Sequence, residues 1–218
     1  MITGLPGSTP KPSPARLIAS RGRRVDKSSM AISSLPSSIR IDDFELRLPD
    51  RRDTAELVRV ANDPEISRWT PLPHPYTATD AEAFVDRSAE WVRIGDLRRT
   101  YVASSPEGVL FGMFGAVRVN EPAECAEIGY WVSAQARRRG IAIRSVRALA
   151  HALLDAGFQR IDAEVGIGNT ASQSVLERAG FVHEGVLRSV SYHGTGLARH
   201  RIDVHKYSLI PSDAAAQQ

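Results

Sequence analysis

A short basic turn in the second half of the chain has the composition of an anion-binding site. Arg137, Arg138 and Arg139 are followed by Gly140 and, two residues later, by the small Ala142. A helix that begins here directs unpaired backbone N–H groups and the positive end of its dipole toward an anion. Glycine allows the backbone to approach closely, and the arginines add charge. The turn is consistent with a phosphate site, and the alternative is a solvated cluster of charges.

A carboxylate lies in the apolar stretch that precedes this turn. Glu127 alternates with Gly129 and Trp131, so these three side chains share one face, while Tyr130 lies on the other. A carboxylate beside a small glycine in such a strand suits a general base, acting directly or through a water molecule. The alternative is a surface charge on a sheet with one solvated face.

The elements around these residues read as strand, helix, strand and helix. A strand at 126–132 leads into the basic turn, and a second strand is expected at 161–165. Between them, apolar residues recur at helical spacing up to Gly157, at Val146, Leu149, Ala150 and Leu153. The final helix of the unit begins near Asn169, where either Asn169 or Thr170 could be the N-cap.

Two motifs in this order resemble those of a known family. Arg137-x-x-Gly140-x-Ala142 resembles the Q/R-x-x-G-x-G/A pyrophosphate loop of the GNAT acetyltransferase superfamily. Asn169-x-x-Ser172, and the later L-x-x-x-G-F at 176–181, are similar to that family's next motif. Residues 184–188 resemble the RimJ/RimL branch, which acetylates the N-termini of ribosomal proteins. The similarity covers residues 44–209, with departures at Arg138, where a second glycine is common, and at 143–144, where relatives often carry Thr-Glu.

The resemblance implies an α+β fold: a mixed, mainly antiparallel sheet with a central parallel βαβ step and flanking helices. It also implies an N-acetyltransferase that uses acetyl-CoA as co-substrate, without a metal, in a direct ternary complex. The acceptor would be a primary amine, either a protein N-terminal α-amine or a small-molecule amine. Since an α-amine has a pKa of about 7.7–8.0 and is partly neutral near neutral pH, a carboxylate base suits it better than lysine.

The resemblance further implies roles for individual residues. Glu127 would be the catalytic base, and Ser172 the acid that protonates or hydrogen-bonds the thiolate. Trp69 and Tyr76 would border the acceptor. The cofactor-binding set comprises backbone groups of the strand, the pyrophosphate loop and the start of the last helix: Trp131, Val132, Arg137, Arg138, Arg139, Gly140, Ile141, Ala142, Ile143, Asn169 and Ser172.

Two other classes of function remain open at this stage. One is a non-catalytic acyl-CoA-binding regulatory module, which would not need Glu127 or Ser172. The other is a nucleic-acid-associated or ribosome-associated protein that acts through a basic tail, since basic residues make nonspecific phosphate contacts. The six histidines show no metal pattern; His200 and His205 are five residues apart on an expected strand and therefore face opposite sides.

The remaining elements follow from local patterns. We expect a strand at 44–48, a helix at 53–62 capped by Asp53, and an irregular segment at 69–76. A helix at 80–94 would start with a capping box of Thr79 and Glu82. A hairpin at 100–104 and 109–119 contains glycines at 112 and 115, which indicate a bulge or a close neighbour, and a terminal strand pair at 182–190 and 200–209 encloses a turn at 192–196.

Charge and composition divide the 218 residues into three parts. The net charge is +3, but residues 1–38 alone carry about +5 and the remainder about −2. We expect a disordered basic extension at 1–40, a transferase domain at 41–211 and a disordered tail at 212–218. The extension could be inert, a transit peptide, a nucleic-acid-binding arm, or a segment upstream of a true start at Met30.

The cysteine content and the apolar runs of the sequence indicate where the protein is located. One cysteine fits a reducing compartment, and no apolar stretch reaches the roughly 20 residues of a membrane span. We therefore expect a cytoplasmic protein that does not bind membranes. Nucleic acid is an improbable partner for the folded part, and a homodimer is compatible with the sequence.

Overall fold

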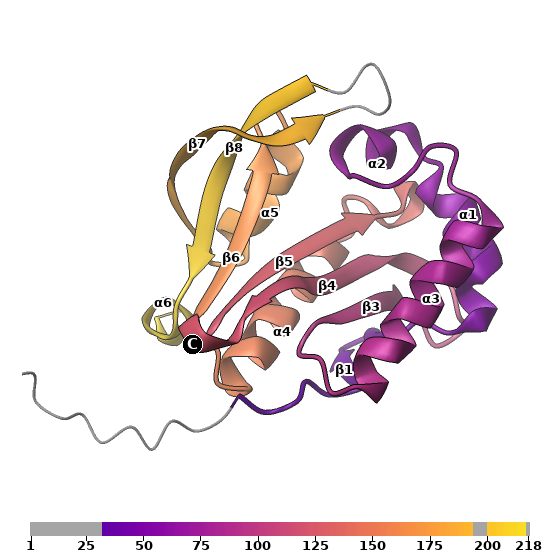
Figure 1. Cartoon of the computed structure of the whole chain (residues 1–218), viewed down its shortest axis with the longest axis horizontal. Helices are drawn as coiled ribbons and strands as arrows, with labels where there is room; N and C mark the ends of the chain where they lie inside the picture. The colour runs from indigo at the N-terminus through magenta and orange to yellow at the C-terminus, as the bar shows by residue number, and fades with distance from the viewer. Residues whose placement is uncertain (1–31, 194–199, 217–218) are drawn as a thin grey trace, which may run out of the picture. The chain divides into compact units, whose positions relative to one another are not determined.

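A computed structural model describes residues 32–193 and 200–216 (Figure 1). The chain divides into two units, residues 1–30 and residues 31–218. The predictions for residues 1–31, and for the turn at 194–196, lie outside the described residues. The second unit is the one that carries the motifs, and everything below concerns that unit alone.

The second unit is built on one eight-stranded sheet with the order β1-β2-β3-β4-β5-β6-β8-β7. Every neighbouring pair is antiparallel except β5 with β6, which is parallel. This arrangement confirms the predicted mixed sheet with one parallel step. The strands are β1 Ser38–Ile41, β2 Phe44–Arg47, β3 Arg99–Ser104, β4 Leu110–Asn120, β5 Cys125–Val132, β6 Arg160–Gly166, β7 Val182–His193 and β8 His200–Leu209.

Helices cover both faces of the sheet and enclose a separate apolar core on each (Figure 1). On one face, α1 (Thr54–Ala61) and α3 (Ala78–Arg93) pack against the sheet, and α2 (Pro64–Trp69) follows α1. On the other face lie α4 (Ile141–Asp155) and α5 (Thr170–Arg178). We call the first the α1/α3 face and the second the α4/α5 face. A short α6 (Pro211–Ala215) ends the described chain.

The parallel step is interrupted soon after it begins. β5 pairs with β6 from Cys125 with Arg160 to Glu127 with Asp162, and in the described chain no pair follows. β5 itself continues for five more residues, paired with β4 as far as Val132. Figure 1 shows the two strands diverging from this point. We call the space between them the split, and it leaves one side of β5 without a partner strand.

Glycines let β4 pack closely against both of its neighbouring strands. A Cβ on Gly112 would lie 2.3 Å from the carbonyl oxygen of Trp131, and one on Gly115 would lie 2.6 Å from that of Arg99. Neither distance is compatible with a side chain. The prediction that these glycines have a close neighbour is therefore confirmed, and β5 is held firmly by β4 while its other side is open.

Helix starts in the first half differ from the predicted ones. Asp50 caps a 3-10 turn before α1, whereas Asp53 is buried and binds Arg47, with 2.7 Å between Oδ1 and Nη2. Asp53 is the N-cap residue of α1, as predicted, but its carboxylate is used for this salt bridge and makes no capping hydrogen bond to α1. The capping box of α3 is formed by Thr77 and Asp80, two residues earlier than the predicted Thr79 and Glu82.

The folded unit also reaches further at both ends than the predicted domain boundaries. Leu35 is buried and residues 38–41 form β1, so part of the predicted disordered extension 1–40 belongs to the sheet. At the other end, α6 and the buried Ala214 lie within the predicted disordered tail 212–218. Buried apolar side chains anchor both segments, although the polar composition of the residues around them indicated disorder.

Candidate active site

The basic turn forms an open helix start, as its sequence suggested. Gly140 has φ 73°, and α4 begins at Ile141 without a hydrogen bond from any capping side chain of the described chain. A Cβ built on Gly140 would have no described atom within 4 Å, so the approach to the helix start is open. The first backbone N–H groups of α4, in residues 141–143, are therefore available to an anion.

The start of α5 contrasts with that of α4. There the backbone N–H of Ser172 donates to Oδ1 of Asn169 at 3.1 Å, so Asn169 is the N-cap and Thr170 is the first helical residue. This settles the two alternatives for the cap. Since α5 satisfies its own N-terminus and α4 does not, α4 is the better anion site of the two.

The arginines of the turn are held in different ways. Arg137 binds Asp63, the N-cap of α2, with 2.7 Å between Nη2 and Oδ2. Arg139 lies over the ring of Phe111 at 5.1 Å. Arg138 adopts φ 61°, a left-handed conformation that glycine tolerates better. That strain explains why a second glycine is common there in the family's motif.

The backbone of β5 presents alternate residues to the split. The N–H of Ser133 donates to the carbonyl of Phe111 in β4 at 2.8 Å. Backbone N–H and C=O groups alternate in direction along a strand. Those of Trp131 therefore also point to β4, whereas those of Val132 and Tyr130 point to the split. Val132 is thus well placed to bind a ligand through its N–H. The structure does not bring the backbone of Trp131 to the split, and the Trp131 ring is buried in the core of the α1/α3 face.

Glu127 lies at the last β5–β6 pair, on the α1/α3 face of the sheet, as the alternation predicted. Its side chain is 17% exposed and binds Arg118 of β4 at 2.8 Å. Burial raises the pKa of Glu127, and the charge of Arg118 opposes that rise. A carboxylate with a raised pKa is a stronger base, which suits proton removal from an amine.

Ser172 lies on the opposite face, beside a tyrosine that the sequence pattern did not single out. The hydroxyl oxygens of Ser172 and Tyr130 are 2.6 Å apart. Tyr130 packs against the core of the α4/α5 face, so Glu127 and Ser172 flank the split from opposite sides. The alternation along β5 placed Tyr130 opposite Glu127, and that was the available signal for its position.

The two aromatic residues predicted to border the acceptor have different environments. Trp69, at the end of α2, lies over the end of β6, and a Cβ on Gly166 would be 3.3 Å from its ring. Tyr76 is buried, and burial raises its pKa to about 12. The amide of Asn62 holds the backbone of Tyr76 on both sides. Tyr76 is thus a core residue, and its contact with a substrate stays a prediction.

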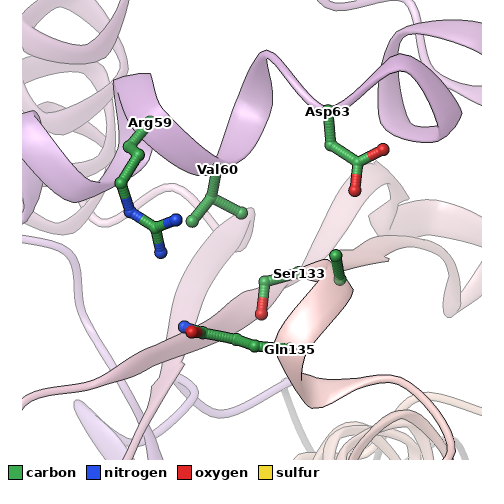
Figure 2. Close-up of a pocket in the computed structure, with 6 residues that line it drawn as sticks. Arg59, Val60, Asp63, Ser133 and Gln135 are labelled. Atoms are coloured by element: carbon green, nitrogen blue, oxygen red, sulfur yellow. The ribbon is translucent and has the colours of Figure 1, made fainter.

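A small cavity lies beside the split, between α1 and the turn that follows β5 (Figure 2). Its volume is about 150 Å³, below the roughly 300 Å³ of typical ligand pockets. Figure 2 shows Asp63 above the turn that carries Ser133 and Gln135, with Arg59 and Val60 on α1. Since Asp63 also binds Arg137, this cavity borders the basic turn without being large enough for a coenzyme.

Across residues 32–193 and 200–216, no group of three or more histidine, cysteine or acidic side chains is arranged to hold a metal ion. No helix in the same part of the chain has the length and apolar character needed to cross a bilayer.

Comparison with known proteins agrees with this geometry. A family model described as an acetyltransferase (GNAT) domain matches residues 43–182. YdaF of Bacillus subtilis (strain 168), provisionally named a ribosomal N-acetyltransferase, is 27% identical over 154 residues, which cover 67% of this chain and 82% of YdaF. The ribosomal-protein-serine acetyltransferase of Escherichia coli (strain K12) is 30% identical over 87 residues, 39% of this chain and 49% of that protein.

A solved structure shows the same fold. RimL, a ribosomal L7/L12 alpha-N-protein acetyltransferase in complex with coenzyme A, matches with a TM-score of 0.71 and 21% identity. The match covers 83% of this chain and 98% of that chain.

Proposed function

Because the chain belongs to the GNAT acetyltransferase family, we propose that the split between β5 and β6 is the active site of an acetyl-CoA-dependent N-acetyltransferase. The early end of β5–β6 pairing at Glu127 is the observation that carries the proposal. It leaves backbone donors of β5 unpaired by any strand in the described chain, next to a helix start without a capping side chain. Both features suit a long, phosphate-bearing thioester substrate.

Binding is assigned to the turn and to β5. The N–H groups at the start of α4, together with Arg137, Arg138, Arg139 and Gly140, would bind the pyrophosphate. Ile141, Ala142 and Ile143 contribute those N–H groups. The N–H of Val132 faces the split and would donate to the thioester oxygen as negative charge develops on it.

Glu127 is assigned the base and Ser172 the donor to the leaving sulfur. An amine that approaches from the α1/α3 face meets the carboxylate of Glu127 first, and its proton passes to that carboxylate. Ser172 lies on the α4/α5 face, beyond the split. This separation keeps the base beside the nucleophile and the donor beside the leaving group. Trp69, at the far end of β6, would limit how an acceptor enters.

We propose a protein N-terminal α-amine as the acceptor. The names of YdaF and of the Escherichia coli relative support this choice, as does the suitability of a single carboxylate base for a partly neutral α-amine. A cytoplasmic location, where ribosomal proteins are made, follows from the same proposal, and the folded unit needs no nucleic acid for it. A homodimer is also proposed, because the edge strand β7 exposes Val182, Val186 and Val190.

The test is release of CoA from acetyl-CoA with peptides of varied N-termini, aminoglycosides and polyamines as acceptors. Glu127→Gln should reduce turnover about a hundredfold or more, within the usual range for loss of a general base. Glu45→Gln is the matched control, because Glu45 is a half-buried carboxylate on β2, which β3 and β4 separate from β5. Equal turnover in Glu127→Gln and wild type would exclude Glu127 as the catalytic base. Binding of acetyl-CoA without turnover of any acceptor would exclude the proposed transferase activity.

A further inference from the structure

The contact between Tyr130 and Ser172 is not needed for the base, the donor or the coenzyme-binding groups of the proposed active site. We propose that Tyr130 is a positioning residue that orients the Ser172 hydroxyl, so that its hydrogen points at the sulfur of the departing thiolate. The proposal rests on the proposed function, because it requires the thioester to lie in the split. Tyr130 would thus influence the departing thiolate only through the hydroxyl of Ser172.

The hydrogen-bond geometry leaves the proton of Ser172 free when Tyr130 donates. The Tyr130 hydroxyl lies 2.6 Å from Oγ of Ser172 and 3.2 Å from its carbonyl oxygen. Either hydroxyl can donate in the 2.6 Å contact. We assign Tyr130 as the donor to Oγ, and in that arrangement the serine keeps its own proton for another acceptor. The backbone N–H of Ser172 is already used by Asn169, so the residue is fixed from both sides.

Two features keep Tyr130 in this role. Its ring stacks on that of Phe114, its cross-strand partner, with ring centres 5.8 Å apart and planes 8° from parallel. Stacking limits the ring to one orientation, so the hydroxyl position is set by β4 and β5. Burial raises the pKa of Tyr130, and the hydroxyl therefore remains a donor over the working pH range.

The position of Tyr130 along β5 matches the point at which the reaction needs a donor. It follows the last β5–β6 pair by three residues, and its side chain reaches α5 on the α4/α5 face. As the amine nitrogen bonds to the acetyl carbon and the carbon–sulfur bond breaks, the electron pair moves to sulfur and the amine proton to Glu127. The Ser172 hydroxyl stabilises the thiolate through a hydrogen bond, without giving up its proton.

The direct test measures the pKa of the CoA thiol when CoA is bound, from the ultraviolet absorbance of the thiolate during a pH titration. In Tyr130→Phe the thiol pKa should rise by about half a unit to one unit, the size expected for one lost hydrogen bond to an anion. Ser172→Ala should give a similar rise, and the double variant no more than Ser172→Ala alone.

Tyr101→Phe is the matched control, because it removes a hydroxyl that donates to Pro36 at 2.7 Å in the core. It should leave the thiol pKa unchanged. An unchanged thiol pKa in Tyr130→Phe would overturn the proposal, and so would a double variant equal to the sum of the two single effects. Loss of folding in Tyr130→Phe, detected by thermal melting, would assign the contact to stability instead.

The outcome is separable from that of the proposed function. The titration needs CoA alone and no acceptor, so a wild-type protein that binds CoA but acetylates nothing still reports on Tyr130 and Ser172. Suppose that the wild-type protein acetylates an acceptor, and that the thiol pKa is the same in Tyr130→Phe as in Tyr101→Phe. That result overturns the role of Tyr130 and leaves the proposed function standing. Failure of wild type to bind CoA overturns both.

Discussion

Three neighbouring charges act on the pKa of Glu127: Arg118 and Lys206 lower it and Glu164 raises it, with Arg118 the largest of the three. Arg118 lies opposite Glu127 on β4 and is 71% exposed, so much of its charge is screened by solvent. Burial raises the pKa of Glu127 and Arg118 lowers it. Arg118→Gln should therefore raise that pKa further, and the acid limb of the profile of kcat/KM against pH should move to higher pH, because the base must be deprotonated to act.

Arg118→Lys is the control for this prediction, because it keeps the positive charge and should keep the wild-type profile. If the profiles of Arg118→Gln and wild type coincide, solvent screening removes the influence of Arg118, and burial together with Glu164 and Lys206 sets the basicity of Glu127.

The sequence predicted the sheet face on which Glu127 lies, but it did not predict the contact of Tyr130 with Ser172. The reason is physical. Alternation is a local property of one strand, so the face of Glu127 follows from residues on either side of it. The contact of Tyr130 with Ser172 joins positions 42 residues apart, and depends on how α5 docks. The burial of Tyr76 was not predictable for a related reason, because an aromatic residue in a loop gives no signal of its burial.

The loop before α4 stores strain at Arg138. A left-handed conformation costs a residue with a side chain about 1–2 kcal/mol, and glycine avoids most of that cost. Arg138→Gly should therefore be more stable than Arg138→Ala by about 1 kcal/mol in the free energy of unfolding, measured by denaturant titration. Both variants lack the guanidinium, so their difference isolates the Cβ. Equal stability would mean that the loop relaxes to avoid this conformation.

The ion pair of Arg137 with Asp63 joins the basic turn to α2. Oδ1 of Asp63 caps the N–H of Glu65, while Oδ2 binds Arg137. Asp63→Asn keeps a good cap and removes the charge, so Arg137 becomes free to bind phosphate. We expect the affinity for CoA to increase about two- to fivefold, measured by calorimetry, consistent with one weak surface ion pair. Arg137→Gln should weaken binding, and weaker binding in Asp63→Asn would instead show that Asp63 positions Arg137 for the coenzyme.

At the scale of the whole unit, the order of elements was predictable and its ends were not. From β2 to β8, long segments with clear periodicity gave the predicted strands and helices, and two glycines marked close strand contacts. The six residues of α2 are too few to show a helical period, and the four of β1, as many as in β2, directly follow a stretch with the composition of a disordered segment. Their positions depend on tertiary contacts, in which Ile66 of α2 and Ile41 of β1 are buried in the two cores.

The start of the folded unit gives the last prediction. Leu35 and Ile41 are buried in the core of the α4/α5 face, and Ser33 donates its backbone N–H to Ala156 at 2.8 Å. A chain of residues 30–218 should keep the melting temperature and CoA affinity of the full chain, because it keeps all of these contacts. A chain of residues 42–218 loses two buried side chains worth about 1.5–3 kcal/mol each. Its melting temperature should fall by about 10–20 °C. If the two shortened chains have the same melting temperature, β1 adds nothing to stability and the stable unit begins at β2.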